Sequence, residues 1–148
     1  MSKIFLNTDG GSRGNPGNAG AGAVVADENE KVLQKASKSL GIMTNNEAEY
    51  HALILGLETI KKFLGKDKAK QTEVIARLDS ELVVKQLNGQ YQIKEERLWP
   101  LFIRVWNIRV ADLPQLTFAY VPREQNKLAD ELANEAMDGA TKTPTIFG

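Results

Sequence analysis

Four of the 19 acidic residues lie where predicted strands or helices begin or end. Asp9 ends the first predicted strand, and Asp79 ends the fourth. Glu49 and Asp130 each lie in the first turn of a predicted helix, next to positions that face the sheet. In open α/β sheets, ligands gather beyond the carboxyl ends of parallel strands. If the first and fourth strands are parallel neighbours, Asp9 and Asp79 lie side by side at that edge.

Carboxylates gathered at one edge of a sheet would form a site for divalent cations. Like charges held close together repel each other, and a bound cation relieves that repulsion. Ligand sets made only of oxygen suit hard ions such as Mg²⁺ or Mn²⁺ and do not suit zinc. Two such ions can activate a water molecule and stabilise a leaving oxygen in phosphodiester hydrolysis. Taken singly, an acid at a helix start could equally complement the helix dipole, but four acids from four segments favour metal-assisted phosphoryl chemistry.

The predicted elements follow the order β-β-β-α-β-α-α-β-α. Short apolar runs predict five strands, at residues 4–6, 21–26, 32–40, 73–78 and 115–121, with a glycine-rich loop after the first. Capping residues and apolar residues three and four positions apart predict four helices, which end near residues 64, 87, 110 and 137. Helices between the last three strands favour parallel pairing there. We therefore expect an α/β fold with a mixed five-stranded sheet, three antiparallel strands and then parallel strands, with helices on both faces.

Length and composition suit one ordinary globular domain, which we expect to span residues 1–148, although 140–148 carry no clear signal. The absence of cysteine excludes disulfides and thiolate metal sites. No apolar run suits a signal peptide or approaches the ~20 residues of a membrane span, so we expect a cytoplasmic protein with no membrane partner. With 19 basic and 19 acidic residues, a polyanion would have to be held by local contacts or metals.

Each of the four acids lies in a longer recognisable segment. The segments are TDGGSRGNPG around Asp9, TNNEAEY around Glu49, RLDSELVVKQLNG around Asp79 and VPREQNKLADELA around Asp130. Together they resemble type 1 ribonuclease H, in the family's order, over the chain from about Lys3 to Met137, and most closely its short archaeal-like and bacterial forms. The resemblance implies an endoribonuclease that hydrolyses the RNA strand of RNA–DNA hybrids with two Mg²⁺ ions, for which Mn²⁺ could substitute.

The resemblance also implies roles for individual residues. The catalytic, metal-binding carboxylates would be Asp9, Glu49, Asp79 and Asp130. Contacts to the RNA strand in the minor groove would come from Gly11, Ser12, Asn15, Asn45 and Asn46. Such short side chains can bond 2′-hydroxyls, and glycine allows close approach of a backbone. Thr44 would hold a phosphate of the DNA strand. The implied partner is an RNA–DNA hybrid, and we expect a monomer.

The chain departs from better-known members of that family in three places. GQYQIKEERLWP stands where those members carry a basic, tryptophan-bearing protrusion, and Ile42 stands where some carry an arginine. The loop before the last acid reads PREQNK and lacks their histidine. In this loop Arg123 could bind the scissile or leaving phosphate as a fixed cation, and Glu124 could accept a proton or attract a metal ion. Both could also be solvated loop charges.

Three further residues invite a functional interpretation. Trp99 and Trp106 share a helical face, and we expect core packing there rather than stacking on bases. His51 is the only histidine, and its position on a different face from Glu49 predicts a surface or boundary residue rather than a general base.

Two other functions stay open at this stage. A nuclease-like fold can hold nucleic acid or a protein without cutting, although four intact acids argue against this. A different enzyme on the same fold, such as a DNA-cutting recombinase or an exonuclease, is the second alternative, because a fold alone does not fix chemistry. Such enzymes often carry three acids and added domains.

Overall fold

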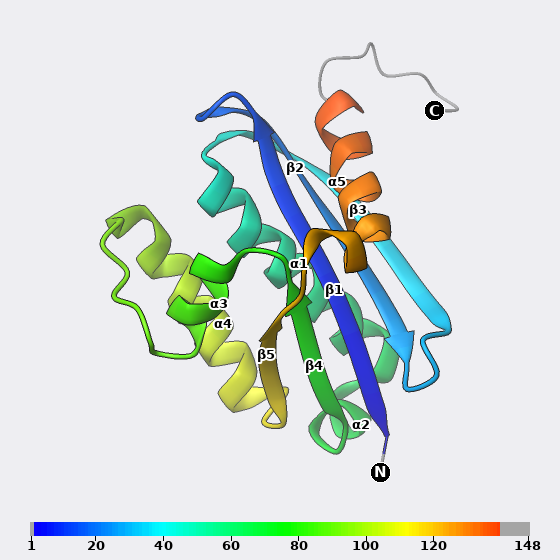
Figure 1. Cartoon of the computed structure of the whole chain (residues 1–148). Helices are drawn as coiled ribbons and strands as arrows, with labels where there is room; N and C mark the ends of the chain where they lie inside the picture. Colours follow the sequence, from blue (N-terminus) through cyan, green and yellow to red (C-terminus); the bar gives the residue numbers. More distant parts are fainter. Residues whose placement is uncertain (1, 140–148) are drawn as a thin grey trace.

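Five strands form one mixed sheet in the computed structural model, which describes residues 2–139 (Figure 1). The strands are β1 (Lys3–Arg13), β2 (Gly17–Asp27), β3 (Val32–Met43), β4 (Glu73–Leu78) and β5 (Leu116–Tyr120), in the order β3-β2-β1-β4-β5. The pairs β1–β2 and β2–β3 are antiparallel, whereas β1–β4 and β4–β5 are parallel. The predicted mixed sheet is confirmed, and its parallel part places the carboxyl end of β4 beside Thr8, in the middle of β1.

Helices cover both faces of the sheet, as predicted. They are α1 (Asn45–Leu64), α2 (Lys66–Lys70), α3 (Glu81–Leu87), α4 (Trp99–Ala111) and α5 (Lys127–Gly139), with short 3-10 helices η1 (Glu96–Leu98) and η2 (Arg123–Gln125). The long helix α1 lies on one face with α4 packed against it, and α5 lies on the opposite face (Figure 1). The core between α1 and the sheet includes Leu6, Leu53, Leu57 and Leu78, which are fully buried. None of the helices in residues 2–139 is long and apolar enough to cross a membrane.

Local capping chemistry explains where two helices begin. Thr44 caps α1, because its hydroxyl accepts from the Glu47 N–H at 3.2 Å and the Glu47 carboxylate accepts from the Thr44 N–H at 3.1 Å. Ser80 caps α3 by accepting from the Val83 N–H at 3.2 Å. Gly65 ends α1 with a φ of 82°. The predicted helix ends near residues 64 and 87 are confirmed, and the two caps fix where Glu49 and Asp79 lie.

The glycine-rich segment is strand rather than loop, so the predicted loop is wrong. The β1 strand continues to Arg13 and β2 begins at Gly17, which leaves only a short turn between them. A Cβ atom on Gly22 would lie 2.3 Å from the carbonyl oxygen of Ala129 in α5, and one on Gly10 would lie 2.1 Å from that of Ala48 in α1. Glycine weakens strands in general, but here it lets a helix approach each face of the sheet closely.

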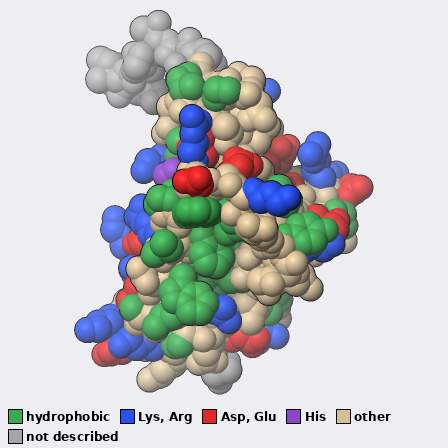
Figure 2. Space-filling model, turned by 90° about the vertical axis from the view of Figure 1, so that its left-hand side faces the viewer, with side chains coloured by type: hydrophobic (Ala, Val, Ile, Leu, Met, Phe, Trp, Pro, Cys, Tyr) green, Lys and Arg blue, Asp and Glu red, His purple; other side chains and the backbone are tan. Residues whose placement is uncertain are grey.

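The outer face of α4 is apolar and exposed. Trp99 and Trp106 are 48% and 53% exposed, so the predicted core packing of these residues is wrong. The helix buries Val105 and Ile108 instead. Figure 2 shows hydrophobic side chains gathered on the side of the molecule that carries α3 and α4. The Trp99 indole N–H donates to the carbonyl of Ile93 at 2.8 Å and so anchors the segment before α4.

Candidate active site

Three carboxylates converge where β4 ends beside the middle of β1. The prediction that Asp9 ends the first strand is wrong, because β1 continues past Asp9 to Arg13 in its pairing with β2. Oxygen atoms of Asp9, Glu49 and Asp79 all lie within 4.8 Å of one another. Asp9 and Asp79 directly follow Thr8 and Leu78, the last paired residues of the β1–β4 ladder. Glu49 reaches them from the first turns of α1. Asp9 and Glu49 are buried, while Asp79 is half-buried.

Asp130 faces the same cavity from α5. The cavity has a volume of about 510 Å³, and its lining includes Asp130 together with the three clustered acids. Asp130 lies in the first turn of α5, as predicted, and its carboxylate is one of the groups that raise the pKa of Asp9. The structure therefore brings the four sequence-predicted acids around one cavity, with three of them in a tight cluster.

The carboxylates of the cluster repel one another, and a bound cation would offset this repulsion. Burial and the charge of Asp79 raise the pKa of Asp9 from 3.8 to about 8. Burial and the charges of Asp9 and Asp79 raise the pKa of Glu49 well above its usual range. Within residues 2–139, the Oε2 atom of Glu49 is buried without a hydrogen-bond partner. An orphaned carboxylate oxygen among other carboxylates fits a hard divalent cation.

Known proteins similar to this chain identify its family. A family model described as "Reverse transcriptase-like" matches residues 7–136. A ribonuclease HI of Halobacterium salinarum is 38% identical over 138 residues, which cover 93% of this chain and 66% of that protein. The solved structure of LC11-RNase H1, isolated from compost, is 47% identical and superimposes with a TM-score of 0.90, covering 96% of this chain and 100% of that one. The chain belongs to the type 1 ribonuclease H family.

The resemblance to ribonuclease H that the four segments carry is thus confirmed. A bifunctional protein of Mycobacterium tuberculosis is 40% identical over 142 residues, which cover 95% of this chain. The chain spans only 37% of the length of that protein. LC11-RNase H1 has also been solved in complex with an RNA/DNA hybrid, and that structure is 46% identical with a TM-score of 0.89.

The residues that resemble ribonuclease H substrate contacts fall into two groups. Gly11, Ser12, Asn45 and Asn46 line the carboxylate cavity. Among the residues that the structure describes, Asn15 and Thr44 do not. Asn15 accepts from the Asn45 N–H at 3.0 Å, and Asn45 in turn accepts from the Ser12 N–H at 2.9 Å. The turn between β1 and β2 is thereby tied to the start of α1.

Five residues that the sequence did not predict also line the cavity: Gly10, Arg13, Ser80, Asn134 and Met137. Asn134 and Met137 lie one and two turns after Asp130 on α5, so helical spacing could have identified both. Arg13 donates to Asn134 at 3.1 Å and to Asp138 at 2.9 Å. These bonds attach the end of β1 to α5.

The loop before α5 places only one of its two candidate residues at the cavity. Arg123 lines it from η2, whereas Glu124, exposed in the same short helix, is absent from the lining among residues 2–139. His51 lies half-buried on α1, as predicted, and burial and Arg104 lower its pKa.

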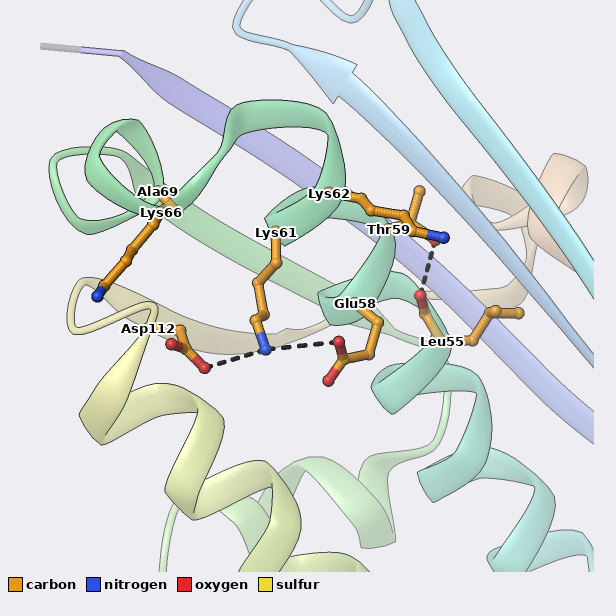
Figure 3. A pocket seen from close by; sticks show the side chains of 8 residues that line it. All are labelled: Leu55, Glu58, Thr59, Lys61, Lys62, Lys66, Ala69 and Asp112. Atoms are coloured by element: carbon orange, nitrogen blue, oxygen red, sulfur yellow. Dashed lines mark hydrogen bonds and ion pairs between the residues drawn. The ribbon is translucent and has the colours of Figure 1, made fainter.

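A second cavity, of about 580 Å³, lies at the far end of α1 (Figure 3). Its lining includes Lys61, whose Nζ atom lies 3.1 Å from Asp112 and 3.4 Å from Glu58. Both acids therefore already have a cationic partner. This partly exposed arrangement connects α1 to the end of α4 and is worth at most about 1 kcal/mol. It offers no counterpart to the unpaired carboxylates of the first cavity.

The raised pKa of Asp9 predicts that the metal-free protein loses stability as the pH rises. A proton that binds with a pKa of about 8 in the folded state and 3.8 in the unfolded state stabilises the fold fully below about pH 4, and this stabilisation is lost as the pH rises through 8. Asp9→Asn removes the ionisation. In EDTA at pH 9 it should raise the Tm by about 4 °C or more, which corresponds to about 1 kcal/mol.

Thermal unfolding of both proteins at pH 4 and pH 9 measures this effect. The two Tm values should differ much less at pH 4, which is close to the unfolded-state pKa of 3.8, because Asp9 stays protonated in the folded state and is partly protonated in the unfolded state. An equal difference in Tm between the two proteins at pH 4 and pH 9 would contradict the assignment of this proton to Asp9.

Proposed function

We propose that this chain is an endoribonuclease that hydrolyses the RNA strand of RNA–DNA hybrids with two Mg²⁺ ions. The observation that carries the proposal is the cluster of Asp9, Glu49 and Asp79 oxygens within 4.8 Å, in a member of the ribonuclease H family. The unpartnered Glu49 oxygen supports a cation at this cluster. The hybrid complex of LC11-RNase H1, which is 46% identical, supports the choice of substrate.

The four acids would be the ligands of the ions. Asp9, Glu49 and Asp79 would form one ligand group, and Asp130 would complete the set from α5. Bound ions supply an activated water and a counter-charge for the leaving oxygen in phosphodiester hydrolysis. The buried carboxyls of Asp9 and Glu49 release their protons when a cation offsets the repulsion between them. This release makes metal binding stronger at higher pH.

The rim of the cavity suits an RNA strand. Ser12, Asn45 and Asn46 present short polar side chains, which can bond the 2′-hydroxyl groups that distinguish RNA from DNA. Gly11 allows a sugar–phosphate backbone to approach closely. Asn15 would act by holding Asn45 in place. The Thr44 hydroxyl accepts from the Glu47 N–H, which leaves its own hydrogen to donate to a DNA-strand phosphate.

The proposal extends to the setting of the reaction. We propose that residues 1–148 form a single domain and that the protein acts in the cytoplasm. A chain without cysteine suits this reducing compartment. The acids and the rim residues all come from one chain, so a monomer would be sufficient to form the site.

Cleavage of four labelled substrates, each with and without Mg²⁺, tests the proposal. The substrates are a hybrid, double-stranded RNA, double-stranded DNA and single-stranded RNA. We expect the hybrid to be cut fastest and only with the metal. Binding of the hybrid without cutting would instead support a non-cleaving module. Cutting of double-stranded DNA at an equal or higher rate would support a different nuclease on the same fold.

Arg123→Ala should lower hybrid turnover by about ten- to a hundredfold. A fixed cation at the cavity stabilises the negative phosphate, and a loss of about 1.4–2.8 kcal/mol at the transition state gives this range. Single-turnover and multiple-turnover rates should be compared, because a fall in the second alone indicates product release. Lys127→Ala removes an exposed cation four residues away and serves as the matched control. An Arg123→Ala rate equal to that of the control would show that this arginine has no part in turnover.

A further inference from the structure

We propose that four side chains, Glu30, Arg77, Asn7 and Asn126, form a polar relay that positions Arg123 and Asp130 at the cavity. The relay rests on the proposed function for its effect on turnover, but its contacts can be tested without activity. It joins the β2–β3 turn, β4, β1 and the start of α5, which are far apart in the sequence.

Asn126 is the end of the relay that contacts the active site. It is 1% exposed, and its Nδ2 atom donates at 2.9 Å to the carbonyl of Thr8, the residue before Asp9. Its backbone N–H donates to the carbonyl of Arg123 at 3.0 Å, and its own carbonyl accepts from the Asp130 N–H at 3.0 Å. One buried residue is therefore bonded next to Asp9 and to the backbones of Arg123 and Asp130. Its position sets how these three cavity residues lie relative to one another.

Asn7 determines which way the Asn126 amide points. The Asn7 Nδ2 atom donates to the Asn126 Oδ1 atom at 2.9 Å and to the Gln125 carbonyl at 3.3 Å. With its oxygen held by Asn7, Asn126 must turn its NH₂ group toward Thr8. Asn7 lies outside the lining of the carboxylate cavity, as far as residues 2–139 show, so it acts through Asn126 and is a positioning residue.

Arg77 in turn fixes the amide of Asn7. Its Nε atom donates to the Asn7 Oδ1 atom at 2.7 Å, so a flipped Asn7 would place its NH₂ group against a permanent donor. The Arg77 guanidinium is itself held in place by two bonds to Glu30, at 2.6 and 2.9 Å, and lies 4.2 Å from the centre of the Phe5 ring. Such a bidentate, stacked arginine has a well-defined orientation. Asn7 and Arg77 are also directly paired in the β1–β4 register.

The Glu30 end of the relay lies in a turn with an unusual backbone. Glu30 has a φ of 65°, a conformation that residues other than glycine seldom adopt. Its carboxylate is nevertheless held by both terminal nitrogens of Arg77. Donation in the relay therefore starts at Arg77: it runs to the Glu30 carboxylate on one side, and through Asn7 and Asn126 to the Thr8 carbonyl on the other.

Two variants break the relay without touching the cavity. Asn7→Asp keeps the side-chain size and the oxygen that accepts from Arg77, but it replaces the donor to Asn126 with a second oxygen. Arg77→Met removes the guanidinium and keeps an unbranched stem over Phe5. We expect each to lower kcat for hybrid cleavage by about tenfold or more with KM changed less than threefold, because small displacements of positioned groups reduce turnover. The double variant should be little worse than either single variant, since both act through Asn126.

Lys61→Met provides the matched control for a lost ion pair. It breaks the contact between α1 and Asp112 at the far end of the molecule, and kcat should stay within twofold of the wild type. If the wild type is active and both relay variants retain its kcat, the relay has no positioning role. If the relay variants lose as much Tm as Lys61→Met and keep the wild-type kcat, their contacts stabilise the fold only. That result would also overturn the positioning role of the relay.

Amide hydrogen exchange tests the relay independently of activity. In Asn7→Asp and Arg77→Met, the Asn126 and Asp130 amides should exchange at least tenfold faster, while amides in the middle of α1 keep the wild-type rate. Unchanged exchange at Asn126 and Asp130 would contradict the relay itself. If the wild type does not cut the hybrid, the proposed function fails, and the exchange rates alone decide whether the relay holds the start of α5.

Discussion

Asp9→Asn and Asp79→Asn should each lower Mg²⁺-dependent cleavage of an RNA–DNA hybrid by about a thousandfold, or about 4 kcal/mol at the transition state. Each substitution keeps the size of the side chain but removes a negative charge that would bind cations in the proposed mechanism. The fold should survive, because Asp9 and Asp79 raise each other's energy in the metal-free protein. The measurement is a single-turnover rate at saturating protein, with Mg²⁺ varied to separate weak metal binding from slow chemistry.

Asp67→Asn is the matched control for this prediction. Asp67 is an exposed acid in α2, so its substitution changes the net charge by the same amount. Its rate should equal that of the wild type. Near-normal, Mg²⁺-dependent cleavage by either Asp9→Asn or Asp79→Asn would show that the carboxylate cluster does not hold the catalytic ions.

Gly10→Ala should destabilise the protein more than the same substitution at Gly11, the other glycine of β1. The new Cβ atom would lie 2.1 Å from the carbonyl oxygen of Ala48, which belongs to the backbone of α1 and cannot turn aside. Relieving this contact requires α1 to move away from the sheet, and Glu49 follows Ala48 directly. Overpacking of this kind costs about 3 kcal/mol, which corresponds to a fall in Tm of about 12 °C.

The adjacent residue offers a close control. A Cβ atom on Gly11 would have the Met137 Cε atom as its nearest neighbour at 3.5 Å, an ordinary contact with a flexible side chain. Gly11→Ala should therefore change the Tm by less than about 3 °C, which is under 1 kcal/mol. Thermal unfolding of the two variants compares them directly. Equal losses of Tm would mean that the close approach of α1 to β1 does not depend on glycine.

The sequence predicted those parts of the fold that local chemistry determines. Thr44 and Ser80 are residue types that commonly cap helices, and α1 and α3 begin directly after them. Helices between the last three strands correctly predicted parallel pairing late in the sheet, as between β4 and β5. The pairing of β1 with β4, which the sequence left as a condition, is what brings Asp9 next to Asp79.

Other features depend on contacts between distant segments. Glycines in β1 and β2 resemble a loop in the sequence, and only the presence of α1 and α5 on the two faces explains them as strand. Trp99 and Trp106 have the spacing of a buried stripe, but α4 turns that stripe outward and buries Val105 and Ile108. The bonds of Asn7 to Arg77 and Asn126 join residues 70 and 119 positions apart, so no local pattern could identify them.

The most direct test of the central claim is a map of cleavage positions in one chimeric strand. The strand carries a short ribonucleotide tract between two deoxyribonucleotide tracts and is paired with complementary DNA. With Mg²⁺ and the wild-type protein, we expect every cut to lie within or at the edge of the ribonucleotide tract, and no cut in EDTA. Cuts spread through the deoxyribonucleotide tracts, or an intact strand at saturating protein and Mg²⁺, would contradict a metal-dependent ribonuclease H activity.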